Sequence, residues 1–290
     1  MTDRPPESYS VPVSGGNLAV HRWPSDQPGR PVVLAAHGIT SNGLSWAAVA
    51  DALPEVEFLA PDLRGRAESR ELPGPYGPDR HAEDLLAVLD HRGGTEPVVL
   101  AGHSMGAFVA SVAAAAHPHR FAKVVLVDGG LAFPVPPGAD IDAVLAATIG
   151  PAMRRLTMEF ADLDAYHRFW REHPSFRAIW NERTIDCLDH DLVGESPRLR
   201  SSCVLDAIRT DGAGLLGDPE VFGAIHRITG PAVLLWAQRG MLDQPEGTYS
   251  ADRMTELPER VPAELVPDVN HYSILFGDNG AKAVAAAIAR

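Results

Sequence analysis

The 290-residue chain has few cysteines, no surplus of basic residues and no long apolar run. Cys187 and Cys203 are the only cysteines, and we expect both to be free, small apolar residues of an intracellular protein rather than a disulfide. A formal net charge of −13 argues against nucleic-acid binding, which requires basic residues to neutralise phosphates. No apolar segment is long enough to span a bilayer, and the polar start has no export signal. These absences predict a cytoplasmic protein with neither nucleic-acid nor membrane partners.

Short apolar runs typical of buried strands recur along the first 130 residues and again near the C-terminus. They occupy residues 31–38, 56–62, 97–104, 123–130 and 231–238. Each is rich in Val, Leu and Ala and is bounded by Gly, Pro or Asp, as parallel strands buried on both faces are. Segments of helical periodicity lie between the first runs, over residues 44–53, 80–91 and 105–117. This alternation predicts an α/β fold with a mostly parallel central sheet and helices on both faces.

The alternation is interrupted between residues 131 and 218, where no buried strand is evident. Aromatic and arginine-rich stretches at helical spacing predict a helical cap folded over the sheet. We therefore expect a core formed by residues 1–130 and 219–290 and a cap formed by residues 131–218. Near the N-terminus, the turn sequence at residues 14–17 lies between two strand-like segments and predicts an antiparallel hairpin at the sheet edge.

A serine lies between two glycines at the point where a predicted strand meets a predicted helix, in the sequence Gly102-His103-Ser104-Met105-Gly106. A serine at such a sharp turn takes strained backbone angles, which lift its hydroxyl above the sheet. The positions two residues away must be small, because a Cβ atom there would collide within the turn. The helix that begins at Met105 directs unpaired N–H groups toward developing negative charge. The pattern predicts that Ser104 is a nucleophile.

With these features the chain resembles the α/β-hydrolase family over nearly its whole length, and the insertion stands where that family has its cap. The sequence HGI, ending at Ile39, resembles the family's oxyanion turn. The stretch PDLRGRAES at residues 61–69 resembles its D-x-R-G-x-G-x-S motif, with Ala67 where glycine is usual. The sequence VNHYSILF resembles the segment that carries the family's catalytic histidine, here His271. The resemblance implies a serine hydrolase.

His271 is the expected base, because it follows a strand-like segment at residues 261–267 and precedes a helix, at the same sheet edge as Ser104. The acid is less clear, since Gly240 occupies the position where the family commonly has it. Asp128 ends the strand after the serine helix, and Asp243 follows Gly240 by three positions; both fit the chain order Ser, Asp, His. We favour Asp128, because the end of a central strand is a rigid place and haloalkane dehalogenases resemble this arrangement. Asp243 remains the alternative.

Backbone N–H groups complete the site that the resemblance implies. Those of Ile39 and Met105 are the expected oxyanion donors, and such donors have no side-chain signature. Nearby, Asp62 and Arg64 are expected to form a structural ion pair that braces their loop.

No pattern in the sequence predicts a cofactor or a metal. His117 and His119 form a close pair but have no further obvious ligand. His190 is expected to be a surface or cap residue. No glycine-rich phosphate loop is present.

The predicted cap concentrates aromatic surface above Ser104. Most of these side chains are expected to form the cap's own core and a few to line an apolar pocket: Tyr166, Phe169, Trp170, Phe176 and Trp180. A cap of this size favours a partly apolar acyl or lactone substrate over a very small ester.

The sequence therefore predicts a serine hydrolase that cleaves a carboxylic ester, lactone or thioester of a small molecule through an acyl-enzyme. A C–C bond hydrolase would use the same three residues. A ligand-binding receptor that keeps the pocket without turnover is the alternative from another class. Epoxide hydrolase and dehalogenase chemistry are disfavoured, because the enzymes that this chain resembles there use an aspartate in place of Ser104. The oligomeric state is not predicted.

Overall fold

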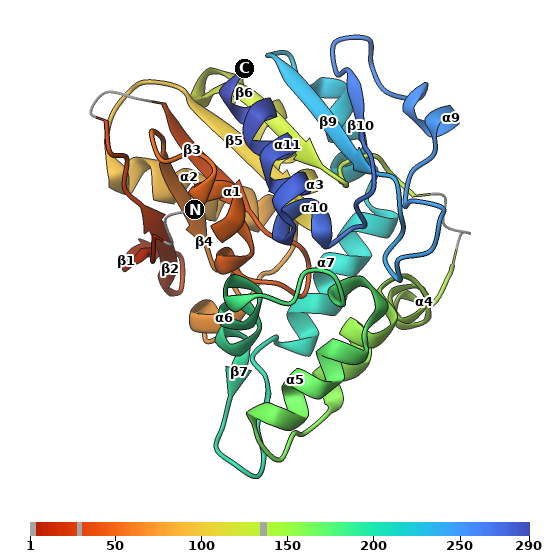
Figure 1. Ribbon diagram of the computed structural model, residues 1–290. Helices are drawn as coiled ribbons and strands as arrows, with labels where there is room; N and C mark the ends of the chain where they lie inside the picture. Colours follow the sequence, from red (N-terminus) through yellow and green to blue (C-terminus); the bar gives the residue numbers. More distant parts are fainter. Residues whose placement is uncertain (1–3, 28–30, 134–137) are drawn as a thin grey trace.

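The computed structural model describes residues 4–27, 31–133 and 138–290. In this part of the chain, eight strands form one sheet in the order β1-β2-β4-β3-β5-β6-β9-β10 (Figure 1). The strands are β1 (Glu7–Val13), β2 (Gly16–Trp23), β3 (Val32–Ala36), β4 (Glu57–Pro61), β5 (Val98–His103), β6 (Phe121–Val127), β9 (Ala232–Ala237) and β10 (Ala263–Val266). The strands from β4 to β10 pair in parallel, whereas β1 with β2 and β2 with β4 pair antiparallel. The predicted α/β fold with a mostly parallel sheet is confirmed.

Helices cover both faces of this sheet. On one face α1 (Ala47–Asp51) contacts α11 (Asp278–Ala289), and on the other α2 (Pro78–Arg92) contacts α3 (Met105–Ala116) (Figure 1). Every residue of β3 and β5 is buried as a result. Strands covered on both sides need apolar side chains at every position, which explains their continuous Val, Leu and Ala runs. The shorter helices α8 (Pro219–Gly223), α9 (Ala251–Met254) and α10 (Ser273–Phe276) complete the core.

The predicted N-terminal hairpin forms one edge of the sheet. Val13 of β1 pairs with Gly16 of β2, and the two strands remain in register back to Glu7 and Arg22. Gly15 in the turn has a φ of 93°, a left-handed conformation that favours glycine. The hairpin prediction is confirmed.

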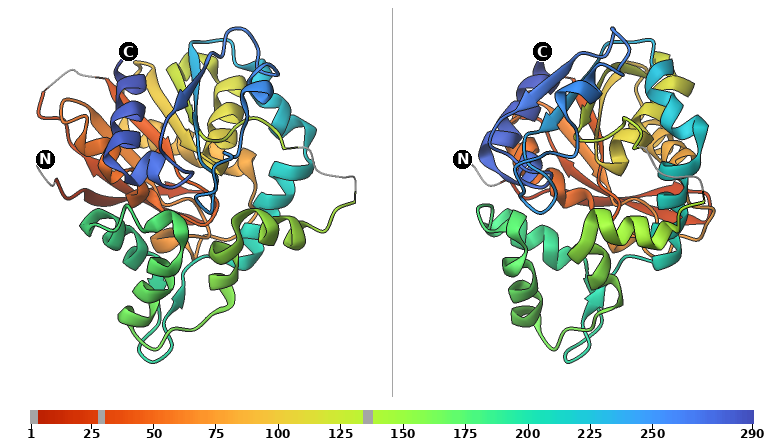
Figure 2. Two further views of the ribbon diagram at one scale, coloured as in Figure 1. Left: turned by 45° about the vertical axis from the view of Figure 1, so that its right-hand side comes forward. Right: turned by 90° about the vertical axis from the view of Figure 1, so that its right-hand side faces the viewer.

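The segment between β6 and β9 is mainly helical, as predicted. It contains α4 (Ile141–Arg154), α5 (Leu163–Glu172), α6 (Glu182–His190) and α7 (Leu205–Gly217). Two strands of two residues each, β7 (Leu192–Val193) and β8 (Arg200–Ser201), pair only with each other and were not predicted. Figures 1 and 2 show α5 and α6 gathered on one side of the sheet, while α7 runs back toward it. Residues 134–137, near the start of the predicted cap, lie outside the described residues, and the division into core and cap stays a prediction.

The aromatic side chains of this segment pack against one another. The ring centroid of Trp170 lies 6.4 Å from that of Tyr166 and 4.7 Å from that of Phe176. Phe160 lies 5.0 Å from Tyr166 in an edge-to-face arrangement. Phe176 also lies 4.8 Å from Tyr272, which precedes α10. The cluster therefore joins the insertion to the C-terminal part of the sheet domain.

The two cysteines are unpaired in the structure, as expected. Cys187 and Cys203 are both free and buried. Burial raises the pKa of the Cys203 thiol to about 12, which keeps it protonated and unreactive near neutral pH. Among the described residues, no helix is long and apolar enough to cross a membrane.

The predicted ion pair between Asp62 and Arg64 is wrong. Arg64 instead forms a two-pronged pair with Asp84 of α2, with N···O distances of 2.7 and 2.8 Å. Asp62 accepts hydrogen bonds from His21 at 3.2 Å and from His190 at 2.8 Å. The chain turns after β4, so these two side chains reach partners on different elements that a local reading cannot detect.

Candidate active site

Ser104 lies between the end of β5 and the start of α3, in a strained conformation. Its φ of 55° and ψ of −120° lie in a region that residues other than glycine rarely adopt. The Ser104 N–H donates to the carbonyl of Val127 at 3.0 Å, and the Ser104 carbonyl accepts from the N–H of Ala107 at 3.0 Å. Hydrogen bonds from the neighbouring strand and from the helix thus hold the turn. The backbone strain expected of this serine is present.

The glycines around Ser104 are required because the backbone approaches them closely. A Cβ atom on Gly102 would lie 2.1 Å from the carbonyl oxygen of Gly106. A Cβ atom on Gly106 would lie 2.1 Å from the carbonyl oxygen of Ala36, at the end of β3. Gly129, which follows β6 and was not singled out from the sequence, would place a Cβ atom 2.3 Å from the Ser104 carbonyl oxygen. Three strand ends therefore converge on the serine.

A buried histidine and a buried aspartate meet at the same edge of the sheet. The Nδ1 atom of His271 lies 2.6 Å from Oδ2 of Asp128, and both residues are buried. The other carboxylate oxygen of Asp128 accepts from the Ala237 N–H at 3.0 Å, which fixes the plane of the carboxylate. Because an ionised carboxylate only accepts hydrogen bonds, Nδ1 of His271 carries the proton and Nε2 has a free electron pair. The Nε2–H group of His103 donates to the carbonyl of His271 at 2.9 Å and holds the loop that carries it.

Asp243, the alternative acid, has different partners. Its Oδ1 atom accepts from Nε of Arg239 at 2.8 Å and from the side-chain amide of Asn270 at 3.0 Å. The hydrogen bond from Arg239 holds the pKa of Asp243 below its usual value. Within the described part of the chain, Asp128 is the acid that bonds to His271. Asp243 instead holds the side chain of Asn270, the residue before His271.

The two expected oxyanion donors lie beside Ser104. Ile39 and Met105 line the same cavity as Ser104. A Cβ atom on Gly38 would lie 3.4 Å from Cβ of Ser104, so the peptide that leads into Ile39 passes next to the hydroxyl. Met105 is the first residue of α3, where backbone N–H groups have no partner within the helix. The donation of these two N–H groups to a substrate remains a prediction.

Arg66 is a positioning residue that sequence reasoning missed. It is fully buried, and its Nε–H group donates to the carbonyl of Ile39 at 3.0 Å, which holds the peptide that follows Ile39. Its guanidinium also forms a 2.5 Å ion pair with Asp211 of α7. Burial would raise the pKa of Asp211, but Arg66 and His81 together, through their charges and hydrogen bonds, hold that pKa below its usual value. The motif at residues 61–69 contains Arg66, but no signal in the sequence connects it with Asp211.

His37 stabilises the other side of the oxyanion turn. Burial lowers its pKa to about 3, so the ring is neutral near pH 7. Nδ1–H donates to the Gly38 carbonyl at 2.8 Å, and Nε2 accepts from the N–H of Leu63 at 2.9 Å. The ring therefore connects the turn after β3 to the loop after β4.

A cavity of about 180 Å³ opens over Ser104 and His271. Its walls are mostly aliphatic and come largely from α4 and α7: Val144, Leu145, Thr148, Ile149, Leu215 and Leu216. Phe108, Phe133 and Met241 complete the apolar lining. The expectation that a few of Tyr166, Phe169, Trp170, Phe176 and Trp180 line this pocket is wrong, since none of the five is part of the lining. Phe133, an aromatic residue within the predicted cap at residues 131–218, does line it. Tyr166, Phe169, Trp170 and Phe176 pack into the aromatic cluster instead. The Trp180 ring lies edge-to-face with that of His167, with 5.7 Å between the centroids.

The fold and this site together define a class of protein. A mostly parallel sheet with helices on both faces presents a strained serine, a histidine paired with an aspartate, and an apolar cavity at one edge. The profile of the alpha/beta hydrolase fold family matches residues 31–278, and the chain belongs to this family.

Individual relatives show how far the similarity extends. Lipase LipV of Mycobacterium tuberculosis is 38% identical over 154 residues, which are 51% of this chain and 58% of that protein. The chain spans about half the length of the curated relatives that it matches. The structure of the thioesterase domain from the curacin biosynthetic pathway aligns with a TM-score of 0.74 and 22% identity, over 98% of this chain and 99% of that one. E-2-(acetamidomethylene)succinate hydrolase aligns with a TM-score of 0.78 and 21% identity, over 98% and 100% of the two chains. At these identities the structural neighbours show the fold alone.

Proposed function

We propose that the protein is a serine hydrolase that cleaves a carboxylic ester, lactone or thioester through an acyl-enzyme. The observation that carries this proposal is the 2.6 Å hydrogen bond between His271 and Asp128 at the floor of the cavity that also contains Ser104. A serine hydroxyl is a weak nucleophile and needs a base whose ring is held in the correct tautomer.

The proposed reaction assigns one role to each group. Nε2 of His271 takes the proton of the Ser104 hydroxyl as Oγ attacks the carbonyl carbon, and then gives it to the leaving alcohol or thiol. Asp128 stays ionised and stabilises the imidazolium. Water then attacks the acyl-enzyme by the same route and regenerates Ser104. The N–H groups of Ile39 and Met105 stabilise the oxyanion, and each such donor typically contributes about 3 kcal/mol.

The cavity supports a short acyl group. Its volume of about 180 Å³ is below the roughly 300–1,000 Å³ that is usual for small-molecule pockets. The aliphatic walls from α4 and α7 favour an unbranched apolar chain and exclude water during the attack. We therefore expect acyl chains of about four to eight carbons to fit best.

The names of the relatives support ester and thioester substrates as the first to test, since one is a lipase and another a thioesterase domain. Nothing in the cavity favours C–C cleavage over ester cleavage, because both would use the same three side chains. A receptor without turnover would have the same pocket. Assays of turnover are needed to distinguish ester cleavage, C–C cleavage and ligand binding without turnover.

A substrate panel tests the proposal. Purified wild-type protein is assayed with p-nitrophenyl esters of two to sixteen carbons, γ- and δ-lactones and acyl thioesters, with Ser104→Ala as the matched control. We expect turnover that peaks near four to eight acyl carbons and is lost in the variant, whose folding is checked by circular dichroism. A folded wild-type protein that hydrolyses none of these compounds would favour the receptor. Turnover that persists in Ser104→Ala would overturn the assignment of the nucleophile.

A further inference from the structure

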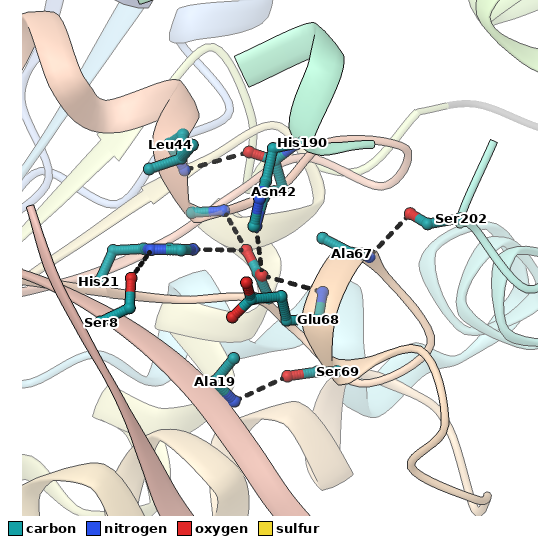
Figure 3. Close-up of polar contacts among 12 residues, drawn as sticks. Ser8, Ala19, His21, Asn42, Leu44, Ala67, Glu68, Ser69, His190 and Ser202 are labelled. Atoms are coloured by element: carbon teal, nitrogen blue, oxygen red, sulfur yellow. Dashed lines mark hydrogen bonds and ion pairs between the residues drawn. The ribbon is translucent and has the colours of Figure 1, made fainter. Parts of the chain in front are cut away.

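Three potential metal ligands from distant parts of the sequence converge outside the Ser104 cavity. His21 lies on β2, Asp62 follows β4, and His190 ends α6. Their ligand atoms all lie within 4.8 Å of one another, and no other group of three or more His, Cys, Asp or Glu residues meets this condition in the described residues. Figure 3 shows His21 and His190 approaching from separate elements. We propose that this cluster binds Zn²⁺ or a similar late first-row divalent cation.

The donor atoms suit such an ion. Two imidazole nitrogens and one carboxylate form a borderline ligand set that zinc, cobalt and nickel accept. Nε2 of His21 lies 3.2 Å from Oδ1 of Asp62, and Nε2 of His190 lies 2.8 Å from Oδ2. Two donors bound at the zinc distances of about 2.0–2.1 Å in tetrahedral geometry are ~3.3 Å apart. To bind an ion, the two nitrogen–oxygen distances need to change only slightly, and the Nε2 atoms of His21 and His190 need to approach each other.

The backbone holds the central carboxylate in place. Asp62 is fully buried, with Oδ1 accepting from the Gly43 N–H at 2.8 Å and Oδ2 accepting from the Glu68 N–H at 3.2 Å. Each carboxylate oxygen can accept a further contact besides its amide. The metal would replace the two imidazole N–H donors and leave these backbone hydrogen bonds in place.

Ser8 provides the outer contact that metal-bound histidines usually have. Its Oγ atom lies 3.0 Å from Nδ1 of His21 (Figure 3). When Nε2 of a neutral ring binds the metal, the ring proton is on Nδ1, and the Ser8 hydroxyl can accept it. Without the metal, Nε2–H donates to Asp62 and the same hydroxyl can donate to Nδ1. The change is a shift of tautomer and requires no net gain or loss of protons by that ring.

The site has an entry path and a source for a fourth ligand. A cavity of about 470 Å³ is lined by His21, His190 and Glu68, among other residues. Glu68 is exposed, and Figure 3 shows its side chain turned toward the cluster. Its carboxylate or a water molecule can complete a four-coordinate site.

The position of the cluster indicates a structural role for the metal. None of its three residues lines the cavity over Ser104, so the proposal does not depend on the proposed hydrolase activity. A bound ion would connect α6 to β2 and to the loop after β4, and so fasten the helical segment to the sheet. An ion that binds the folded chain and not the unfolded one raises the stability of the fold.

Metal titration of the full-length protein tests the proposal. Chelator-treated protein is titrated with Zn²⁺ in a calorimeter and with Co²⁺ in an absorption spectrometer. His190→Gln removes a ligand, Ser8→Ala removes only the outer contact, and His167→Gln is the matched control. His167 also belongs to the helical segment and pairs with a carboxylate, that of Asp189 at 2.6 Å, but is outside the three-ligand cluster.

We expect one Zn²⁺ per chain in the wild type and in His167→Gln, and visible Co²⁺ bands of a four- or five-coordinate site. Affinity should fall at least about a hundredfold in His190→Gln and about 10- to 100-fold in Ser8→Ala. Should His190→Gln fail to fold, as judged by circular dichroism, the Ser8→Ala result decides. Absence of binding at micromolar Zn²⁺ in the wild type, or binding unchanged in both variants, would overturn the proposal.

Discussion

Replacing Asp128 by asparagine tests the arrangement of the candidate active site in the greatest detail. Asn has the same shape as Asp, so the variant should keep the fold. The Ala237 N–H, 3.0 Å from Oδ1 of Asp128, needs an acceptor and will select the amide oxygen of Asn. The amide NH₂ group then occupies the position of Oδ2, which lies 2.6 Å from Nδ1 of His271. Two donors cannot share that contact.

The ring of His271 must therefore change its tautomer. Nδ1 would become the acceptor, the proton would be on Nε2, and no electron pair would remain to take the proton of Ser104. In a serine protease the corresponding change lowers kcat by about 10⁴. We expect a loss of the same order in kcat for p-nitrophenyl butyrate, with KM changed less than about threefold because the cavity walls are intact.

Asp243→Asn is the matched control. Asp243 is about a third exposed and pairs with Arg239, so the loss of this pair should cost at most about 1 kcal/mol of stability and leave kcat within a few-fold of wild type. Both variants are compared with the wild type in steady-state kinetics and thermal unfolding. A large loss of kcat in Asp243→Asn together with a nearly unchanged Asp128→Asn would refute this reasoning and assign the acid to Asp243.

Three further predictions follow from the packing of the site. Gly106→Ala should abolish the cooperative unfolding transition, because its Cβ would lie 2.1 Å from the Ala36 carbonyl oxygen. Gly217→Ala is the control and should unfold like the wild type, because a Cβ atom there would have no neighbouring atom within 4 Å. Ile149→Ala enlarges the cavity and should move the preferred acyl chain to greater length by one or two carbons, at a cost of about 2–5 kcal/mol of stability in urea unfolding. Since the pKa of His37 is lowered to about 3, the unfolded chain takes up a proton first as the pH falls below about 6.5. The free energy of unfolding should then fall by about 1.4 kcal/mol per pH unit from this residue until pH ~3, and urea unfolding at pH 5 and 7.5 should show a smaller difference in His37→Gln.

The sheet was predictable because it leaves a strong local signal. A strand buried on both faces needs apolar side chains at every position, so the run at residues 97–104 predicted β5, which extends over Val98–His103. The two-residue strands β7 and β8 leave no such signal, because they are too short for a periodic pattern and pair only with each other.

The turn around Ser104 was predictable for a similar reason. Glycines on both sides of the serine, within one short segment, indicate that the backbone passes too close for a side chain there. The choice between Asp128 and Asp243 was not predictable, because both fit the chain order and only the folded chain shows which carboxylate meets His271. The departure from the family motif at Ala67 is visible in the sequence, but its structural meaning is not. Ala67 stands where the family usually has glycine, and its φ of 41° explains why glycine is favoured there.

Contacts between distant elements left no trace in the sequence. Arg66 and Asp211 form an ion pair, and Asp62 joins His21 on β2 to His190 on α6. Short, regular spacings in a sequence indicate metal ligands, and His117 with His119 has such a spacing, whereas His21, Asp62 and His190 do not. The cluster around Asp62 arises only when the sheet and the helical segment pack together.

Covalent labelling tests the central claim most directly. The wild type and Ser104→Ala are incubated with a fluorophosphonate, and intact-protein mass spectrometry is followed by peptide mapping. If His271 activates Ser104, one adduct per chain should form on the peptide that contains Ser104, none in Ser104→Ala, and labelling should be much slower in His271→Ala. A folded wild-type protein that takes up no label, or label on a different residue, would contradict the account.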